Sequence, residues 1–89
     1  MWKIEFDPRA AKELLKIDRQ AARRIKSYLD NRIATSEDPR RFGEALSENL
    51  SGLWRYRTGD YRIIAEIRDE VFLVLVLRIG HRRNVYGGH

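Results

Sequence analysis

Apolar and polar residues alternate through "WKIEF" (residues 2–6), and this pattern predicts a short, half-buried β-strand. Asp7 and Pro8 follow directly. A capping carboxylate and then a proline favour the first turn of an α-helix at this point. The apolar face of the predicted helix is formed by Ala11, Leu14 and Leu15, with Ile17 near its end.

A second helix is predicted to begin at Asp18, whose carboxylate can cap it. Apolar residues then recur at spacings of three and four, at Ala22, Ile25, Leu29 and Ile33. The opposite face carries Arg23, Lys26, Ser27 and Asp30. Two consecutive amphipathic helices indicate an αα-hairpin that lies on one face of a sheet.

The periodicity fades between residues 34 and 52, and we interpret this segment as a tethered loop. Asp38 and Pro39 can open a short helical turn within it. Gly43 and the stretch 47–51 argue against a continuous helix. Because long loops are uncommon inside small domains, this one is a candidate functional segment.

The last third of the chain is predicted to form three strands, at residues 53–58, 61–68 and 71–79. The first two are joined by Gly59-Asp60, which predicts a two-residue hairpin loop. The third is apolar on both faces, so it is expected inside the sheet with coverage on both sides. The predicted fold is a single α+β domain (residues 1–89), with the N-terminal strand and αα-hairpin packed on an antiparallel sheet of about four strands.

Composition restricts the partners of this domain. The 89 residues include no cysteine, and 18 Lys and Arg outnumber 13 Asp and Glu, for a net charge of +5. Such a charge favours RNA, DNA, an acidic protein or a membrane surface as partner. The longest apolar run has seven residues, against the ~20 of a membrane helix, and no secretory signal is visible. We therefore expect a soluble, cytoplasmic protein without a membrane partner.

An arginine cluster is predicted on the hairpin. With Gly59-Asp60 as the loop, Arg57 opposes Arg62, and strand alternation places Arg55 on the same face. Directly opposed like charges cost a hairpin something under ~1 kcal/mol per pair, so a bound anion explains the cluster better than folding does. The alternative is that Glu66 and Glu70 neutralise the arginines and that the face is simply solvated.

The closing "IGHRRNVY" (residues 79–86) gathers further candidates: His81, Arg82, Arg83 and Tyr86. The last strand pairs beside the strand of Arg62, so these residues are expected near one end of the sheet, where Gly80 can turn the chain. Cleavage of RNA by its own 2′-hydroxyl needs a proton acceptor, positive charge on the phosphate and a proton donor, without a metal or other cofactor. Arginines supply the charge, and the imidazole of His81 can transfer protons.

The chain resembles the RelE/ParE superfamily of type II toxin–antitoxin toxins, the RelE branch more than the ParE branch. The resemblance rests on "FDPRAAKELLK", "DPRRFGEALSENLSGLWRYRTGDYRIIAEI" and the closing "GHRRNVY". It implies a fold similar to microbial ribonucleases. It also implies an mRNA interferase that cuts messages in the ribosomal A site, a RelB-like antitoxin, and operator DNA bound only through the antitoxin complex.

Matching by motif assigns catalytic positions to Arg55, Arg62, Arg82 and Tyr86, with His81 as a further candidate. Arg57 and Arg83 are expected to hold the RNA backbone. Leu53 stands where some members have a second catalytic lysine, and His81 is the residue that can compensate for it.

Three functions follow from these observations. The leading hypothesis is a ribosome-dependent, metal-independent endoribonuclease toxin. The second is a ParE-like toxin that inhibits DNA gyrase without catalysis, and the third is a basic domain that binds RNA without cleaving it.

Overall fold

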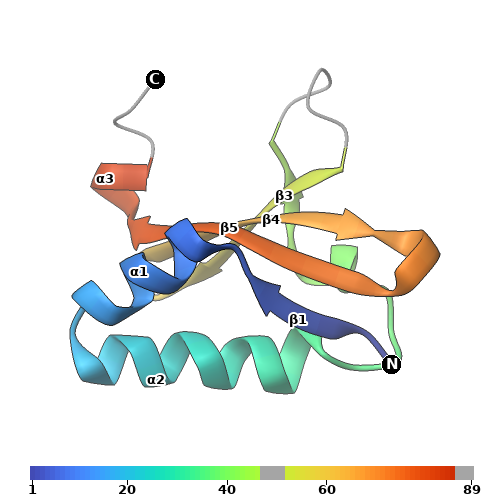
Figure 1. Ribbon diagram of the computed structural model, residues 1–89, viewed down its shortest axis with the longest axis horizontal. Helices are drawn as coiled ribbons and strands as arrows, with labels where there is room; N and C mark the ends of the chain where they lie inside the picture. The colour runs from blue at the N-terminus through green and yellow to red at the C-terminus, as the bar shows by residue number, and fades with distance from the viewer. Residues whose placement is uncertain (47–51, 86–89) are drawn as a thin grey trace.

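Two helices, α1 (Pro8–Lys16) and α2 (Arg19–Tyr28), lie on one face of a five-stranded sheet in the computed structural model (Figure 1). The structure describes residues 1–46 and 52–85. The predicted α+β class is confirmed. No helix in these two ranges has the length and apolar character needed to cross a membrane.

Both predicted helix starts are confirmed by their caps. The Asp7 carboxylate accepts a hydrogen bond from the backbone N–H of Arg9 at 3.0 Å, and that of Asp18 accepts one from Ala21 at 3.1 Å. Each cap satisfies a backbone donor that has no partner within the first turn. Beyond α2 the chain continues as a π-helical turn, η1 (Leu29–Ile33), so the apolar stripe extends into the core.

The core lies between the helices and the sheet. The helices contribute Ala10, Ala21, Ile25, Leu29 and Ile33, and the sheet contributes Tyr56, Ile63, Ala65, Ile67, Val74, Val76 and Ile79. The prediction that Leu15 faces the core is wrong, because its side chain is 85% exposed. Ala10, Leu14 and Ile17 follow the helical spacing of four and three, and Leu15 lies off this stripe.

The sheet has the order β1-β5-β4-β3-β2, which places β5 (Leu73–His81) in the interior as predicted. Its other strands are β1 (Lys3–Phe6), β2 (Glu44–Ala45), β3 (Leu53–Thr58) and β4 (Tyr61–Arg68). The sheet is mixed, since β1 pairs parallel to β5, and the expected antiparallel sheet of about four strands needs this correction. Coverage on both faces is also wrong: the helices cover one face, and Leu75 and Leu77 of β5 stay half-buried.

The connection between β4 and β5 is longer than the two residues, Asp69 and Glu70, that separate the predicted strands. It contains a 3-10 turn, η3 (Asp69–Val71), and Phe72 in the left-handed region at φ 51°. The last strand therefore begins at Leu73 rather than residue 71 and continues to His81 rather than ending at residue 79. Within β5 the pairing with β4 also shifts between Ile64 and Ala65, where β5 carries one extra residue, and this irregularity determines which face the residues at its end occupy.

The segment 34–46 is fastened to the sheet. The predicted helical turn at Asp38 and Pro39 is confirmed as a 3-10 helix, η2 (Pro39–Phe42), and the Pro39 carbonyl accepts a hydrogen bond from the buried Tyr56 hydroxyl at 2.8 Å. Strand β2, which was not predicted, follows at Glu44–Ala45. Gly43 permits this approach, since a Cβ there would lie 2.9 Å from the Tyr56 ring. Residues 47–51 of the predicted loop lie outside the described residues.

Candidate nucleic-acid interface

The β3–β4 hairpin has the predicted register. Arg57 lies directly opposite Arg62, Arg55 lies opposite Ile64, and Gly59 closes the turn at φ 60°. Arg55, Arg57 and Arg62 therefore share the face of the sheet that the helices leave uncovered, because Tyr56 and Ile63 point into the core on the other face. We call these three residues the arginine face.

A carboxylate from β2 lies among these arginines. The Glu44 Oε1 atom accepts a hydrogen bond from Arg55 Nη2 at 2.7 Å and lies 3.7 Å from Arg57 Nε. The hydrogen bond to Arg55 and then the charges of Arg55, Arg57 and Arg62 hold the pKa of Glu44 below its ordinary value. Glu44 is therefore ionised at neutral pH and lies within the field of all three guanidiniums.

Sequence reasoning missed Glu44, and its alternative interpretation named Glu66 and Glu70 as the residues that neutralise the arginines. In the structure Glu66 pairs with Arg68 at 2.8 Å, and Glu44 occupies the position opposite Arg55. The segment before β3 has no periodic pattern to reveal this. The sequence signal that could have revealed this strand is Gly43. A glycine lacks a Cβ and so permits a close approach to another strand, which here brings the following Glu44 beside β3.

Arg62 is the most enclosed member of the arginine face, with 9% of its surface exposed. Its Nη1 atom donates to the Gly59 carbonyl at 3.1 Å and to the Tyr61 carbonyl at 3.0 Å. Among the described residues these are the hydrogen bonds of this guanidinium, so Nε and Nη2 keep their hydrogens for a ligand. Beside it on β5 is Gly80, which contributes no side chain. The result is a fixed guanidinium that is almost fully enclosed.

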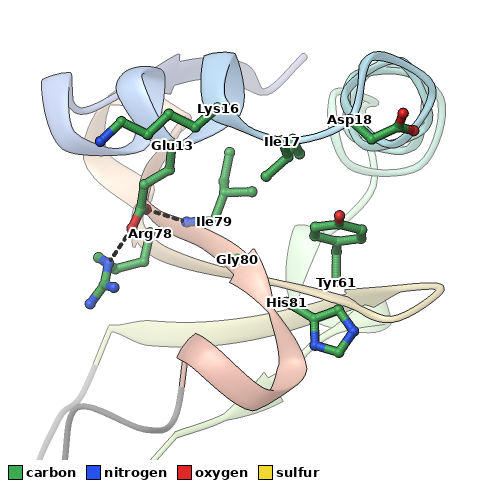
Figure 2. Close-up of a pocket in the computed structure, with 9 residues that line it drawn as sticks. All are labelled: Glu13, Lys16, Ile17, Asp18, Tyr61, Arg78, Ile79, Gly80 and His81. Carbon is green, nitrogen blue, oxygen red and sulfur yellow. Dashed lines mark hydrogen bonds and ion pairs between the residues drawn. The ribbon is translucent and has the colours of Figure 1, made fainter.

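The structure separates His81 from the arginine face. His81 pairs with Tyr61 across β4 and β5, and the two rings meet edge to face with centroids 5.8 Å apart. Tyr61 belongs to the helix-covered face, and Figure 2 shows its ring between His81 and the link of α1 and α2 at Ile17 and Asp18. The Nδ1 atom of His81 accepts a hydrogen bond from the Arg83 N–H at 3.3 Å, so a neutral ring carries its proton on Nε2.

His81 lines a cavity of about 410 Å³ whose charged groups are balanced in sign. At its other end Glu13 accepts hydrogen bonds from Arg78 at 3.1 Å and from the Ile79 backbone N–H at 2.7 Å (Figure 2). These bonds fasten α1 to the part of β5 that extends past β1. Glu13 thus has a structural role, because its carboxylate satisfies the backbone N–H of Ile79, which would otherwise be unpaired.

The start of the C-terminal segment is tied to the tip of the hairpin. The Arg82 backbone N–H donates to the Asp60 carbonyl at 2.8 Å, at the beginning of the short helix α3 (Arg82–Val85). The side chains of Arg82 and Arg83 are both exposed. The end of β5 therefore lies beside the turn that carries Arg62, and Tyr86 lies outside the described residues.

Comparison with known proteins gives the chain its family. Residues 4–86 match a family model described as the ParE toxin of the type II toxin–antitoxin system parDE. Toxin RelG of Mycobacterium tuberculosis is 39% identical over 51 residues, which are 57% of this chain and 59% of RelG. The match therefore spans about three fifths of that relative's length.

Solved structures share the fold over almost the whole chain. The RelBE2 toxin–antitoxin complex of M. tuberculosis has a TM-score of 0.81 at 28% identity, covering 91% of this chain and 98% of the other. Isolated RelE of Escherichia coli has a TM-score of 0.74 at 21% identity, with 99% and 94% covered. The RelB–RelE complex of Methanococcus jannaschii has a TM-score of 0.73 at 20% identity, with 94% and 96% covered. Together with the family match over residues 4–86, these likenesses show that the chain belongs to the RelE/ParE superfamily of type II toxin–antitoxin toxins.

Proposed function

We propose that this toxin is a ribosome-dependent endoribonuclease, which cleaves messenger RNA by attack of a 2′-hydroxyl on the adjacent phosphate. The observation that carries the proposal is the arginine face, where Arg57 and Arg62 are directly opposed and Arg55 lies on the same side. A phosphate that gains charge in the transition state is stabilised by guanidiniums already oriented toward it. Arg62 is the best placed for this role, because its backbone bonds fix its plane before the substrate binds.

Glu44 is our candidate for the proton acceptor. It is ionised at neutral pH, exposed, and hydrogen-bonded to Arg55 within the arginine face. A phosphate that draws Arg55 away from the carboxylate raises the pKa of Glu44 toward its ordinary value and so makes it a stronger base. Leu53 stands where some family members have a second catalytic lysine. With Glu44 as the proton acceptor, the proposed mechanism does not need a lysine at that position.

The C-terminal segment supplies the remaining roles. Arg82 follows β5 beside the hairpin turn and is proposed to contact the same phosphate, with Arg83 and Arg57 on the neighbouring backbone. Tyr86 is proposed to stack on the cleaved nucleotide and to protonate the leaving 5′-oxygen. We favour it over His81, because the ring of His81 packs on Tyr61 on the opposite face of the sheet.

The proposed partners are the ribosome with its message and a RelB-like antitoxin. Several solved structures that share this fold are described as complexes of RelE with RelB. An antitoxin with acidic residues is complementary in charge to this chain of net charge +5. Operator DNA is expected to be bound only through the toxin–antitoxin complex, and the site of action is the cytoplasm, where ribosomes translate.

Primer extension on a translated message tests the proposal. The wild type should cut the message, and Arg82→Ala should abolish the cuts. Arg9→Ala is the matched control, because it removes one exposed arginine at the start of α1 on the helix side. Unchanged cutting by Arg82→Ala, or equal loss in both variants, would contradict the assignment.

A second candidate is inhibition of DNA gyrase without RNA cleavage. It is favoured by one observation, namely that the matching family model is described as the ParE toxin. The two candidates differ in a supercoiling assay with purified gyrase. An endoribonuclease leaves supercoiling unchanged and cuts the message. A gyrase inhibitor blocks supercoiling and leaves the message intact.

A further inference from the structure

A second basic site lies on the other side of the hairpin from the arginine face. A groove of about 300 Å³ runs between α2 and the end of β3. It is lined by Arg24, Ser27, Tyr28, Asn31, Arg32 and Thr58, and we call it the α2 groove. None of these side chains is a carboxylate, whereas the cavity beside His81 contains both Glu13 and Asp18.

The two guanidiniums of the α2 groove are positioned without acidic partners. Arg24 lies against the hairpin turn, with Nη1 3.3 Å from the place where a Cβ of Gly59 would stand. Arg32 lies 5.9 Å from the centroid of the Phe42 ring. Within residues 1–46 and 52–85 neither forms a salt bridge, in contrast to Arg55, which pairs with Glu44. Two oriented guanidiniums without a counter-ion favour an anionic ligand.

The other polar groups of the groove are suited to the same ligand. The Asn31 side-chain amide donates to Ser27 Oγ at 3.0 Å, so the hydroxyl hydrogen of Ser27 is available to an acceptor. Burial raises the pKa of Tyr28, which keeps its hydroxyl protonated at neutral pH. Phosphate oxygens accept hydrogen bonds and donate none, so a groove rich in donors matches them. Tyr28 is the one aromatic side chain among the lining residues, so the groove has no cluster of aromatic anchors to hold a protein segment.

We propose that the α2 groove is a second RNA-binding site, which holds a backbone phosphate on the side of the hairpin opposite the arginine face. The hairpin turn connects the two sites: Arg62 bonds to the Gly59 carbonyl from one side, and Arg24 lies against Gly59 from the other. An RNA strand that crosses this turn contacts both. The inference rests on the proposed function in taking RNA as the ligand, and the phosphate belongs either to the message or to ribosomal RNA.

Binding of a labelled, 2′-O-methylated single-stranded RNA, followed by fluorescence anisotropy in a salt series, tests the groove without any cleavage. The double variant Arg24→Gln/Arg32→Gln should weaken binding and reduce the slope of log affinity against log salt by about 0.7, the value for one phosphate contact on a single strand. Arg19→Gln/Arg23→Gln is the matched control, because it removes the same charge from exposed positions of α2 outside the groove.

A second pair of variants leaves every arginine in place. Ser27→Glu puts a carboxylate into the α2 groove, and Gln20→Glu makes the same change of charge elsewhere on α2. Ser27→Glu should weaken RNA binding several-fold more than Gln20→Glu. Thermal melts by circular dichroism verify that all four variants fold.

Cosedimentation with vacant ribosomes distinguishes the two sources of the phosphate. If the groove variants lose binding to free RNA but still cosediment with vacant ribosomes, the phosphate belongs to the message. If they bind free RNA normally but no longer cosediment with vacant ribosomes, it belongs to ribosomal RNA. Equal effects of groove and control variants in both assays would overturn the proposal, as would a loss of antitoxin binding with RNA binding unchanged. Because the RNA cannot be cut, failure of the groove is separate from failure of the endoribonuclease, which the Arg82→Ala experiment detects.

Discussion

The hydrogen bond between Tyr56 and Pro39 should contribute strongly to holding the segment that carries Glu44 against the sheet. The Tyr56 side chain is fully buried, and its hydroxyl donates to the Pro39 carbonyl at 2.8 Å across 17 residues of sequence. Tyr56→Phe removes the donor and preserves the ring, including its edge-to-face contact with Tyr28 at 6.3 Å. The change therefore isolates one buried hydrogen bond.

The expected cost follows from the burial of both partners. Pro39 is also buried, so its carbonyl loses its partner without gaining water, which costs about 1–3 kcal/mol of the free energy of unfolding. For a domain of this size each kcal/mol lowers the melting temperature by about 4–8 °C. Urea unfolding should show a lower midpoint with an unchanged slope, because the surface exposed on unfolding stays the same.

Tyr61→Phe is the matched control, since it also removes one tyrosine hydroxyl, from a half-buried ring of the neighbouring strand. Its loss should stay within about 0.5 kcal/mol, because the ring is kept and the hydroxyl has no hydrogen-bond partner among the described residues. If Tyr56→Phe costs no more than Tyr61→Phe, the buried bond does not fasten η2 to the sheet, and the reasoning is refuted.

Three further outcomes are expected. Gly43→Ala places a Cβ 2.9 Å from the Tyr56 ring and should cost about 1–3 kcal/mol in urea unfolding; an unchanged midpoint would show that β2 can shift at no cost. Glu44→Gln should lower message cleavage by about 10²–10⁴-fold with RNA binding retained, and full activity would exclude it as the base. The hydrogen bond from Arg40 holds the pKa of Asp69 below its ordinary value of 3.8, so its stabilisation is present above that value and is lost as the pH falls through the lower folded pKa. The melting temperatures of wild type and Asp69→Asn should therefore differ at neutral pH and converge in acid; a constant gap would contradict the assignment.

Local chemistry in the sequence was enough for the helices and the hairpin. Asp7 and Asp18 predict the starts of two helices, because each carboxylate accepts a hydrogen bond from a backbone N–H only two or three residues away. The Gly59-Asp60 turn, together with strand alternation, predicts that Arg57 opposes Arg62. Such features depend on neighbours in the chain, so the residues themselves carry the information.

The positions of Glu44 and His81 were decided by tertiary structure. Glu44 reaches Arg55 through a two-residue strand that follows an aperiodic segment, and the parallel pairing of β1 with β5 likewise joins distant residues. The face of His81 depends on the register shift beside Ile64 and Ala65, since one extra residue exchanges the two faces of a strand. The sequence by itself therefore determined which charged residues this toxin carries, and long-range strand pairing decided which of them share a face.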